Sequence, residues 1–208
     1  RMALAQRRRT ACVALTGALL AGYMGCCSSR PALVELKAMD RKMDMRRFMG
    51  SWYVLAHIPV KLVNEHLAHN AVETYTWDEK KERIGVHYRF NEKALDGRIN
   101  DSYQRGWIWN KETSAEWRVS PKLPLFGYLF SYCGLKLPYI IVDCAADYST
   151  AIVGYPNRAY LWILSRKPAV SDSEYEKLIK TSTDLGYDAE KIRKVPQTPD
   201  AETFEVPS

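Results

Sequence analysis

The chain has 208 residues, enough for one domain of about 150 residues with extensions at its ends. Its formal net charge is +6, but residues 1–26 hold four arginines and no acidic residue, which leaves 26 basic against 24 acidic residues in the rest. This nearly neutral body has no block of like charge and no basic stripe. The sequence therefore argues against a nucleic-acid-binding protein.

Residues 1–28 have the pattern of an export signal or a lipoprotein-type anchor segment. Three arginines precede a mostly apolar stretch from Ala11 to Met24, which is shorter than the roughly 20 residues that span a bilayer. The following Gly25-Cys26 resembles the site at which a lipoprotein is cleaved and lipidated, here at Cys26. Ordinary cleavage and an uncleaved anchor are the alternatives. We expect an exported protein, either anchored to a membrane in the manner of an outer-membrane lipoprotein or secreted into the periplasm or beyond.

Two of the five cysteines, Cys133 and Cys144, lie in the body of the chain. Their spacing of eleven suits neither a zinc knuckle nor a redox C-x-x-C pair. In an exported protein they could form one disulfide. Two unpaired, partly buried thiols are the alternative.

Residues 29–46 are a charged lead-in, and from residue 51 the chain consists of short segments rich in aromatic and β-branched residues. Turn signals such as Asp96-Gly97 separate these segments. We predict eight strands, at 51–58, 70–77, 84–91, 101–109, 115–119, 139–144, 150–155 and 160–166. Eight strands with short turns predict an all-β, up-and-down antiparallel barrel around one small ligand.

A single helix is predicted after the strands. Ser171 and Glu174 have the spacing of a capping box, and Gly186 is a stop signal. One apolar face at helical spacing is formed by Tyr175, Leu178, Ile179 and Leu185. Such a helix would pack against the outside of the barrel, and residues 198–208 would form a flexible tail.

The order of short motifs along the chain resembles the lipocalin family. The matches to its three signature patches, G-x-W, T-D-Y and a late arginine, are Gly50, Trp52, Asp147, Tyr148 and Arg166. Ala146 stands where the second patch has Thr. The resemblance covers about residues 47–197 and is strongest to bacterial lipocalins, plant temperature-induced lipocalins and apolipoprotein D. It implies that the five matching residues serve folding, with Arg166 packed across Trp52 at the narrow end of the barrel.

Strand alternation, with the register implied by the family, selects residues that face the barrel interior. The expected ligand contacts are Val54, Ala56, Ala71, Glu73, Tyr75, Trp117, Tyr160 and Trp162. Small residues near the mouth and aromatic residues deeper in suit a long acyl chain. The alternative is that the aromatic side chains fill a solid core.

Glu73 is unusual among these positions, because an unpaired carboxylate in an apolar barrel is costly. Pairing with Arg89 or Arg105, or a position near a wet mouth, would lower that cost. A one-residue register slip that turns Glu73 outward is the alternative.

The segment 121–138 is long, apolar and restrained by three prolines. It joins the fifth and sixth strands, so this topology places it at the open mouth, where we expect it to contact a membrane surface. The expected contacts are Leu125, Phe126, Tyr128, Leu129 and Phe130. The alternative is a loop that folds back and caps the barrel.

The sequence shows no convincing nucleophile–base pair and no phosphate loop, and no cysteine or acidic cluster completes a metal site with His66 and His69. We therefore expect no enzyme activity, no metal and no cofactor. The resemblance implies binding and transport or storage of a fatty acid, a lysophospholipid or a similar lipid, with a role in stress response or membrane maintenance. The alternatives are a lipid- or isoprenoid-modifying enzyme and a protein-interaction module that uses the 121–138 loop.

Overall fold

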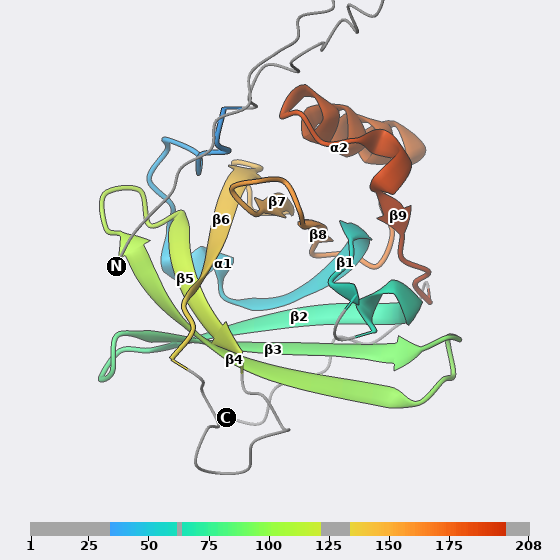
Figure 1. The fold of residues 1–208 in the computed structure, drawn as a ribbon, viewed down its shortest axis with the longest axis horizontal. Helices are drawn as coiled ribbons and strands as arrows, with labels where there is room; N and C mark the ends of the chain where they lie inside the picture. The colour runs from blue at the N-terminus through green and yellow to red at the C-terminus, as the bar shows by residue number, and fades with distance from the viewer. Residues whose placement is uncertain (1–33, 62–63, 122–133, 199–208) are drawn as a thin grey trace, which may run out of the picture. The chain divides into compact units, whose positions relative to one another are not determined.

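A computed structural model describes residues 34–61, 64–121 and 134–198 and confirms the predicted fold class. Eight antiparallel strands form a closed barrel (Figure 1). They are β1 Gly50–Ile58, β2 Ala68–Asp78, β3 Arg83–Glu92, β4 Ile99–Asn110, β5 Glu116–Pro121, β6 Leu137–Cys144, β7 Thr150–Gly154 and β8 Leu161–Ser165. Each strand pairs with the next in sequence, and β1 pairs with both β2 and β8, which closes the ring.

Alternation along the strands produces two separate apolar clusters. On β3, Ile84, Val86, Tyr88 and Phe90 are buried while the residues between them are half-buried, as expected for a strand with one face inward. The inner cluster lines the barrel interior around Trp52. The outer cluster joins the outside of β1, β6, β7 and β8 to the C-terminal helix.

The predicted helix is α2, Asp172–Asp184, and it lies outside the ring of strands (Figure 1). Ser171 caps its start by accepting a hydrogen bond from the Glu174 backbone N–H at 3.3 Å. Leu178 is buried in the outer cluster, and Gly186 ends the helix at φ +88°, in the left-handed region that favours glycine. Two further elements follow, the 3-10 turn η5 Ala189–Lys191 and the short strand β9 Arg193–Lys194.

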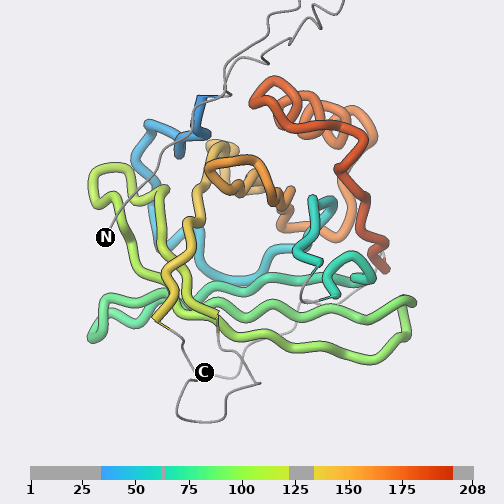
Figure 2. Tube along the Cα trace, in the orientation of Figure 1, coloured from blue at the N-terminus to red at the C-terminus, as the bar shows by residue number. Residues whose placement is uncertain are grey.

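The residues before β1 run along the barrel wall. The backbone N–H groups of Leu36, Met39 and Met43 donate to carbonyls of the barrel at 2.8–2.9 Å. Figure 2 shows this segment, in blue, beside the yellow-to-orange part of the chain that contains β6 and β7. It leads into the short helix α1, Met45–Phe48, which Asp44 caps.

One end of the barrel is closed by Arg166. Its guanidinium donates to the carbonyls of Arg47, Phe48, Met49 and Ser51 at 2.7–3.1 Å. These four carbonyls belong to α1 and the start of β1, so one side chain fixes the turn between the two elements.

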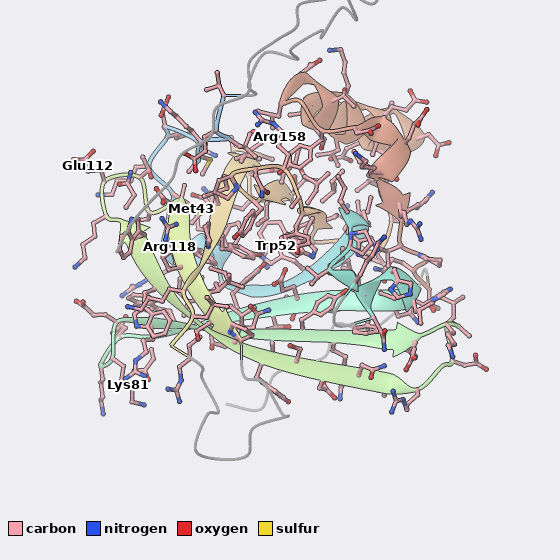
Figure 3. The ribbon with its side chains drawn as sticks, in the orientation of Figure 1. Met43, Trp52, Lys81, Glu112, Arg118 and Arg158 are labelled. Carbon is pink, nitrogen blue, oxygen red and sulfur yellow. The ribbon has the colours of Figure 1, made fainter. Side chains whose placement is uncertain are left out.

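Trp52 lies directly against this guanidinium. The Arg166 Cζ is 3.7 Å from the centroid of the Trp52 ring, and the indole N–H donates to the Phe48 carbonyl at 2.8 Å. Figure 3 shows Trp52 inside the ring of strands, whereas Lys81 and Glu112 lie at turns on its outside. Gly50 adopts φ +92°, and a Cβ there would lie 3.4 Å from Arg166 Nη1, so the approach of the guanidinium favours glycine.

The last described residues join β1 to β2 in the other half of the barrel. Direct pairing between these two strands is confined to Gly50–Tyr53 of β1. Beyond it, the Gln197 side-chain amide donates to the carbonyls of Val54 at 2.9 Å and Ala71 at 3.0 Å. The segment that contains β9 therefore bridges the place where β1 and β2 separate.

We predict that Arg166→Lys lowers the free energy of unfolding by about 2–4 kcal/mol. A lysine ammonium group lacks the planar arrangement of N–H donors with which the guanidinium binds four carbonyls. Urea denaturation followed by circular dichroism measures this change. Arg46→Lys is the matched control, since the exposed Arg46 forms an ion pair with Glu79, which is exposed as well, and we expect a change within about 0.5 kcal/mol there. Equal effects of the two substitutions would contradict the assigned role of Arg166.

Candidate functional site

The two ends of the barrel differ. Because strand direction alternates, the connections β1–β2, β3–β4, β5–β6 and β7–β8 share one end, opposite α1 and Arg166. We call this end the mouth. The inward positions of β4 are buried at Gly106 and half-buried at Gln104 and Ser102, so burial decreases toward the mouth along this strand, whereas Tyr88 and Phe90 on the neighbouring β3 stay buried.

A buried polar cluster lies in the interior between these ends. The Tyr139 hydroxyl on β6 donates to Glu73 Oε2 on β2 at 3.2 Å and is also hydrogen-bonded to the Tyr75 hydroxyl. All three side chains are buried. Hydrogen bonds between polar side chains therefore connect β2 and β6, which are distant in the sequence, inside an otherwise apolar cluster.

Glu73 faces inward, so the alternative of an outward register is wrong. Arg89 and Arg105 do not reach it, since both occupy outward positions and Arg89 Nε donates to Asp101 Oδ1 at 3.0 Å. Burial raises the pKa of Glu73 to about 7; the charge of Glu65 adds to this rise, and hydrogen bonds from Tyr75 and Tyr139 oppose it. The carboxyl group therefore titrates near neutral pH.

Glu65 is a second buried carboxylate, and the sequence analysis did not identify it. It lies on the 3-10 turn η2, Glu65–Leu67, in the β1–β2 connection at the mouth. Its oxygens accept from the Trp162 indole N–H at 2.5 Å and from the Val60 backbone N–H at 2.6 Å. His57 Nδ1 is 3.6 Å from Glu65 Oε1, with both side chains buried. Because Glu65 lies in a connection between two strands, it is not part of an alternating sequence pattern and could not be identified from one.

The expected inward orientation of Ala56 is wrong. The β1–β8 register pairs Val54 with Leu164 but Ala56 with Ile163, which places a β-bulge between Val54 and Ala56. Ala56 therefore joins the outer cluster. His57 takes the inward position opposite Trp162, because the extra residue reverses the alternation beyond it.

The other expected contacts are distributed along the interior. Val54, Ala71, Tyr75 and Trp117 belong to the inner cluster, and Trp162 packs against it. Tyr160 precedes β8, with its ring centroid 6.2 Å from that of Trp162. Tyr139 was missed although it alternates with Leu137 and Ile141, and its ring stacks on Trp117 at 5.4 Å and on Trp162 at 6.0 Å.

The signature residues gather at the closed end. Tyr148 adopts φ +63°, its hydroxyl accepts from the Asp44 backbone N–H at 2.7 Å, and the Arg47 guanidinium lies 4.3 Å from its ring centroid. Asp147 accepts from the backbone N–H and hydroxyl of Ser149. These contacts are far from the mouth and hold the turn after β6 against α1.

Several predictions fall on residues that the structure does not describe. They are Cys26 with the export segment, Cys133, and the membrane-contact residues Leu125, Phe126, Tyr128, Leu129 and Phe130. Cys144 is a buried thiol, and its pairing with Cys133 stays a prediction because Cys133 lies outside the described residues.

Within residues 34–61, 64–121 and 134–198, no cluster of His, Cys, Asp and Glu side chains is suited to hold a metal ion. No helix in these ranges is long and apolar enough to span a bilayer.

Replacement of Glu73 by Gln should stabilise the protein in a pH-dependent way. The folded chain holds this proton more tightly than the unfolded chain, so ionisation of Glu73 destabilises the fold as pH rises from about 4.5 to about 7. Glu73→Gln should therefore raise the free energy of unfolding by up to about 3 kcal/mol at pH 8 and hardly at all at pH 4. Urea titrations at both pH values test this, with Glu79→Gln on an exposed turn as the control. A gain that is equal at the two pH values would contradict the account.

Comparisons with known proteins agree with this geometry. The lipocalin-like domain family matches residues 43–197. Temperature-induced lipocalin-1 of Arabidopsis thaliana is 29% identical over 178 residues, covering 80% of this chain and 87% of the relative. Outer membrane lipoprotein Blc of Escherichia coli K12 is 25% identical over 191 residues, covering 88% of this chain and 96% of the relative.

Among solved structures, insecticyanin from the tobacco hornworm Manduca sexta superposes with a TM-score of 0.58 at 20% identity, covering 80% of this chain and 86% of that one. This likeness shows the shared fold. Together with the family match over most of the chain, it establishes that the protein belongs to the lipocalin family, whose members bind small hydrophobic ligands.

Proposed function

We propose that this lipocalin binds a single-chain amphiphilic lipid inside the barrel and carries or stores it. Fatty acids, lysophospholipids and similar lipids are the classes to test. The observation that supports this most is the partial exposure of Trp162 and of the inward side chains of β4 near the mouth. The rings around Trp52 are fully buried, whereas Trp162 and the inward side chains of β4 nearest the mouth are only half-buried.

The chemistry of the lining favours an alkyl chain. Val54, Ala71, Trp117 and Trp162 present aliphatic and aromatic surface to the interior. Transfer of apolar surface from water contributes about 25 cal/mol per Å² before the entropic cost of ordering the ligand is subtracted. A flexible chain of methylene groups fits between aromatic walls without requiring hydrogen bonds along its length.

Action at a membrane is part of the proposal. The basic, then apolar, segment that ends at Cys26 supports an exported and lipid-anchored protein, and the E. coli relative is named an outer membrane lipoprotein. The apolar 121–138 segment, with Phe126 and Phe130, would contact the bilayer from which the ligand is taken. A role in membrane maintenance or stress follows from this reading, and the plant relative is named for its induction by temperature.

The test is native mass spectrometry of the full chain purified from cells, followed by lipid extraction. We expect one lipid per chain. Gln104→Trp should abolish it, because Gln104 is an inward residue of β4, opposite the buried Val86, at the level where burial decreases. Tyr103→Trp is the matched control, since Tyr103 is the adjacent outward residue, 49% exposed, and should leave the lipid in place.

A protein that carries no lipid and takes up none when acyl lipids are added would contradict the proposal. So would loss of lipid from both tryptophan variants to the same extent, because the bound molecule would then lie outside the barrel or depend on general stability.

A further inference from the structure

Among the described residues, the barrel interior holds two carboxyl groups, Glu65 and Glu73, and the basic side chain buried with them is His57, 3.6 Å from Glu65 Oε1. No lysine or arginine in the described ranges is buried. Arg166, the nearest basic residue to the inner cluster at the closed end, is occupied by backbone carbonyls and Trp52. The interior is therefore an acidic environment enclosed by apolar walls.

Two buried polar atoms adjoin these carboxyl groups. Tyr88 lies directly opposite Glu73 in the β2–β3 register, and its buried hydroxyl makes no hydrogen bond of standard geometry. Burial raises the pKa of Tyr88 most, and the charges of Glu65 and Glu73 and a side-chain contact with Glu65 add to this rise. His57 Nδ1 is buried 3.6 Å from Glu65 Oε1, slightly beyond hydrogen-bond distance. Buried polar atoms are normally satisfied, so the Tyr88 hydroxyl indicates a missing polar group.

Aromatic rings complete the surroundings. Tyr139, which donates to Glu73, stacks on Trp162, which donates to Glu65, with ring centroids 6.0 Å apart. Trp117 lies on the other side of Tyr139 at 5.4 Å. Aromatic faces and edges beside carboxylates form the kind of environment that stabilises an organic cation.

We propose that the interior holds a subsite for the positively charged ammonium group of the lipid, formed by Glu65, Glu73 and the Tyr88 hydroxyl. This inference rests on the proposed function and, among single-chain amphiphiles, favours those with a cationic head group over fatty acids and lysophospholipids. A primary ammonium group has three N–H donors, and these three side chains supply acceptors for them. A carboxylate or phosphate head group would instead be repelled by the two glutamates.

The position of the subsite also sets the direction of the ligand. Glu73 is paired with Trp52, near the closed end, whereas Glu65 lies in the connection at the mouth. If the ammonium group binds between these two residues, the ligand enters the barrel with its ammonium group first. Its alkyl chain then extends past Trp162 toward the mouth. The charged group is thereby removed from water only where carboxylates replace its hydration.

The experiment compares three probes with the same alkyl chain on the delipidated full chain at pH 7.5. Dodecylamine, dodecanol and dodecanoate, each below its micelle concentration, are titrated while tryptophan fluorescence and calorimetric heat are recorded. We expect dodecylamine to bind at least about tenfold more tightly than dodecanoate, since a charge-assisted hydrogen bond is worth about a factor of ten or more. Dodecanol should bind with intermediate affinity.

Variants separate the charged subsite from the apolar interior. Glu73→Gln and Tyr88→Phe should each weaken dodecylamine binding by about tenfold while changing dodecanol binding less than about twofold. They are preferred to Glu65→Gln, because Glu65 also holds Trp162 and Val60 in place. Glu79→Gln, on the exposed β2–β3 turn, is the control and should change neither probe.

The outcomes distinguish this inference from the proposed function. Equal binding of amine and alcohol, unchanged by Glu73→Gln, would overturn the ammonium subsite while the barrel remained a lipid carrier. Tightest binding of dodecanoate would do the same. Failure of all three probes to bind would overturn the proposed function and the subsite with it.

Discussion

The contact between Arg166 and the start of the barrel is the constraint on which the rest of the structure depends. A guanidinium with five N–H groups in one plane serves four backbone carbonyls at the α1–β1 junction and lies flat over Trp52. Burial lowers the pKa of Arg166 to about 10, which still leaves it charged at neutral pH. Because the carbonyls and the indole replace its hydration, this charge can be placed where β1 and β8 meet.

Closure at this end has consequences for the other. With Phe48, Trp52 and Trp117 packed above Arg166, the inner cluster is dense at the closed end, and the partly exposed interior residues lie toward the mouth. The mouth is also where β1 and β2 separate and Gln197 bridges them. The signature residues therefore pack at the closed end, and the partly exposed Trp162 and inward side chains of β4 lie toward the mouth, where the ligand is proposed to enter.

The buried Glu73 is costly for folding when it is ionised, and the proposed cationic ligand gives this cost a function. A carboxyl group whose pKa is raised to about 7 by burial destabilises the folded state whenever it is ionised. Residues selected for stability alone would be apolar at such a position. A cationic ligand removes the cost by supplying the missing charge, so ligand binding and folding would stabilise each other.

Most of the fold follows from local rules, since alternating apolar residues and turn signals located all eight strands to within two residues of their observed ends. The site was harder to predict. Alternation failed at Ala56 and His57, because a β-bulge is a backbone irregularity with no marker in the residues themselves. Glu65 lies in a connection and reaches the interior only through tertiary contacts with Trp162 and Val60. The sequence suggested arginines on neighbouring strands as partners of Glu73. Its partners are instead tyrosines, one of them on the far side of the barrel.

The most direct test of ligand binding inside the barrel is a crystal structure with a dodecylamine that carries bromine at the end of its chain. Anomalous scattering locates the bromine without reference to the protein coordinates. We expect one strong peak inside the ring of strands, on the mouth side of Trp162. A peak instead in the outer groove lined by Leu55, Tyr175 and Lys194 beneath α2 would contradict it.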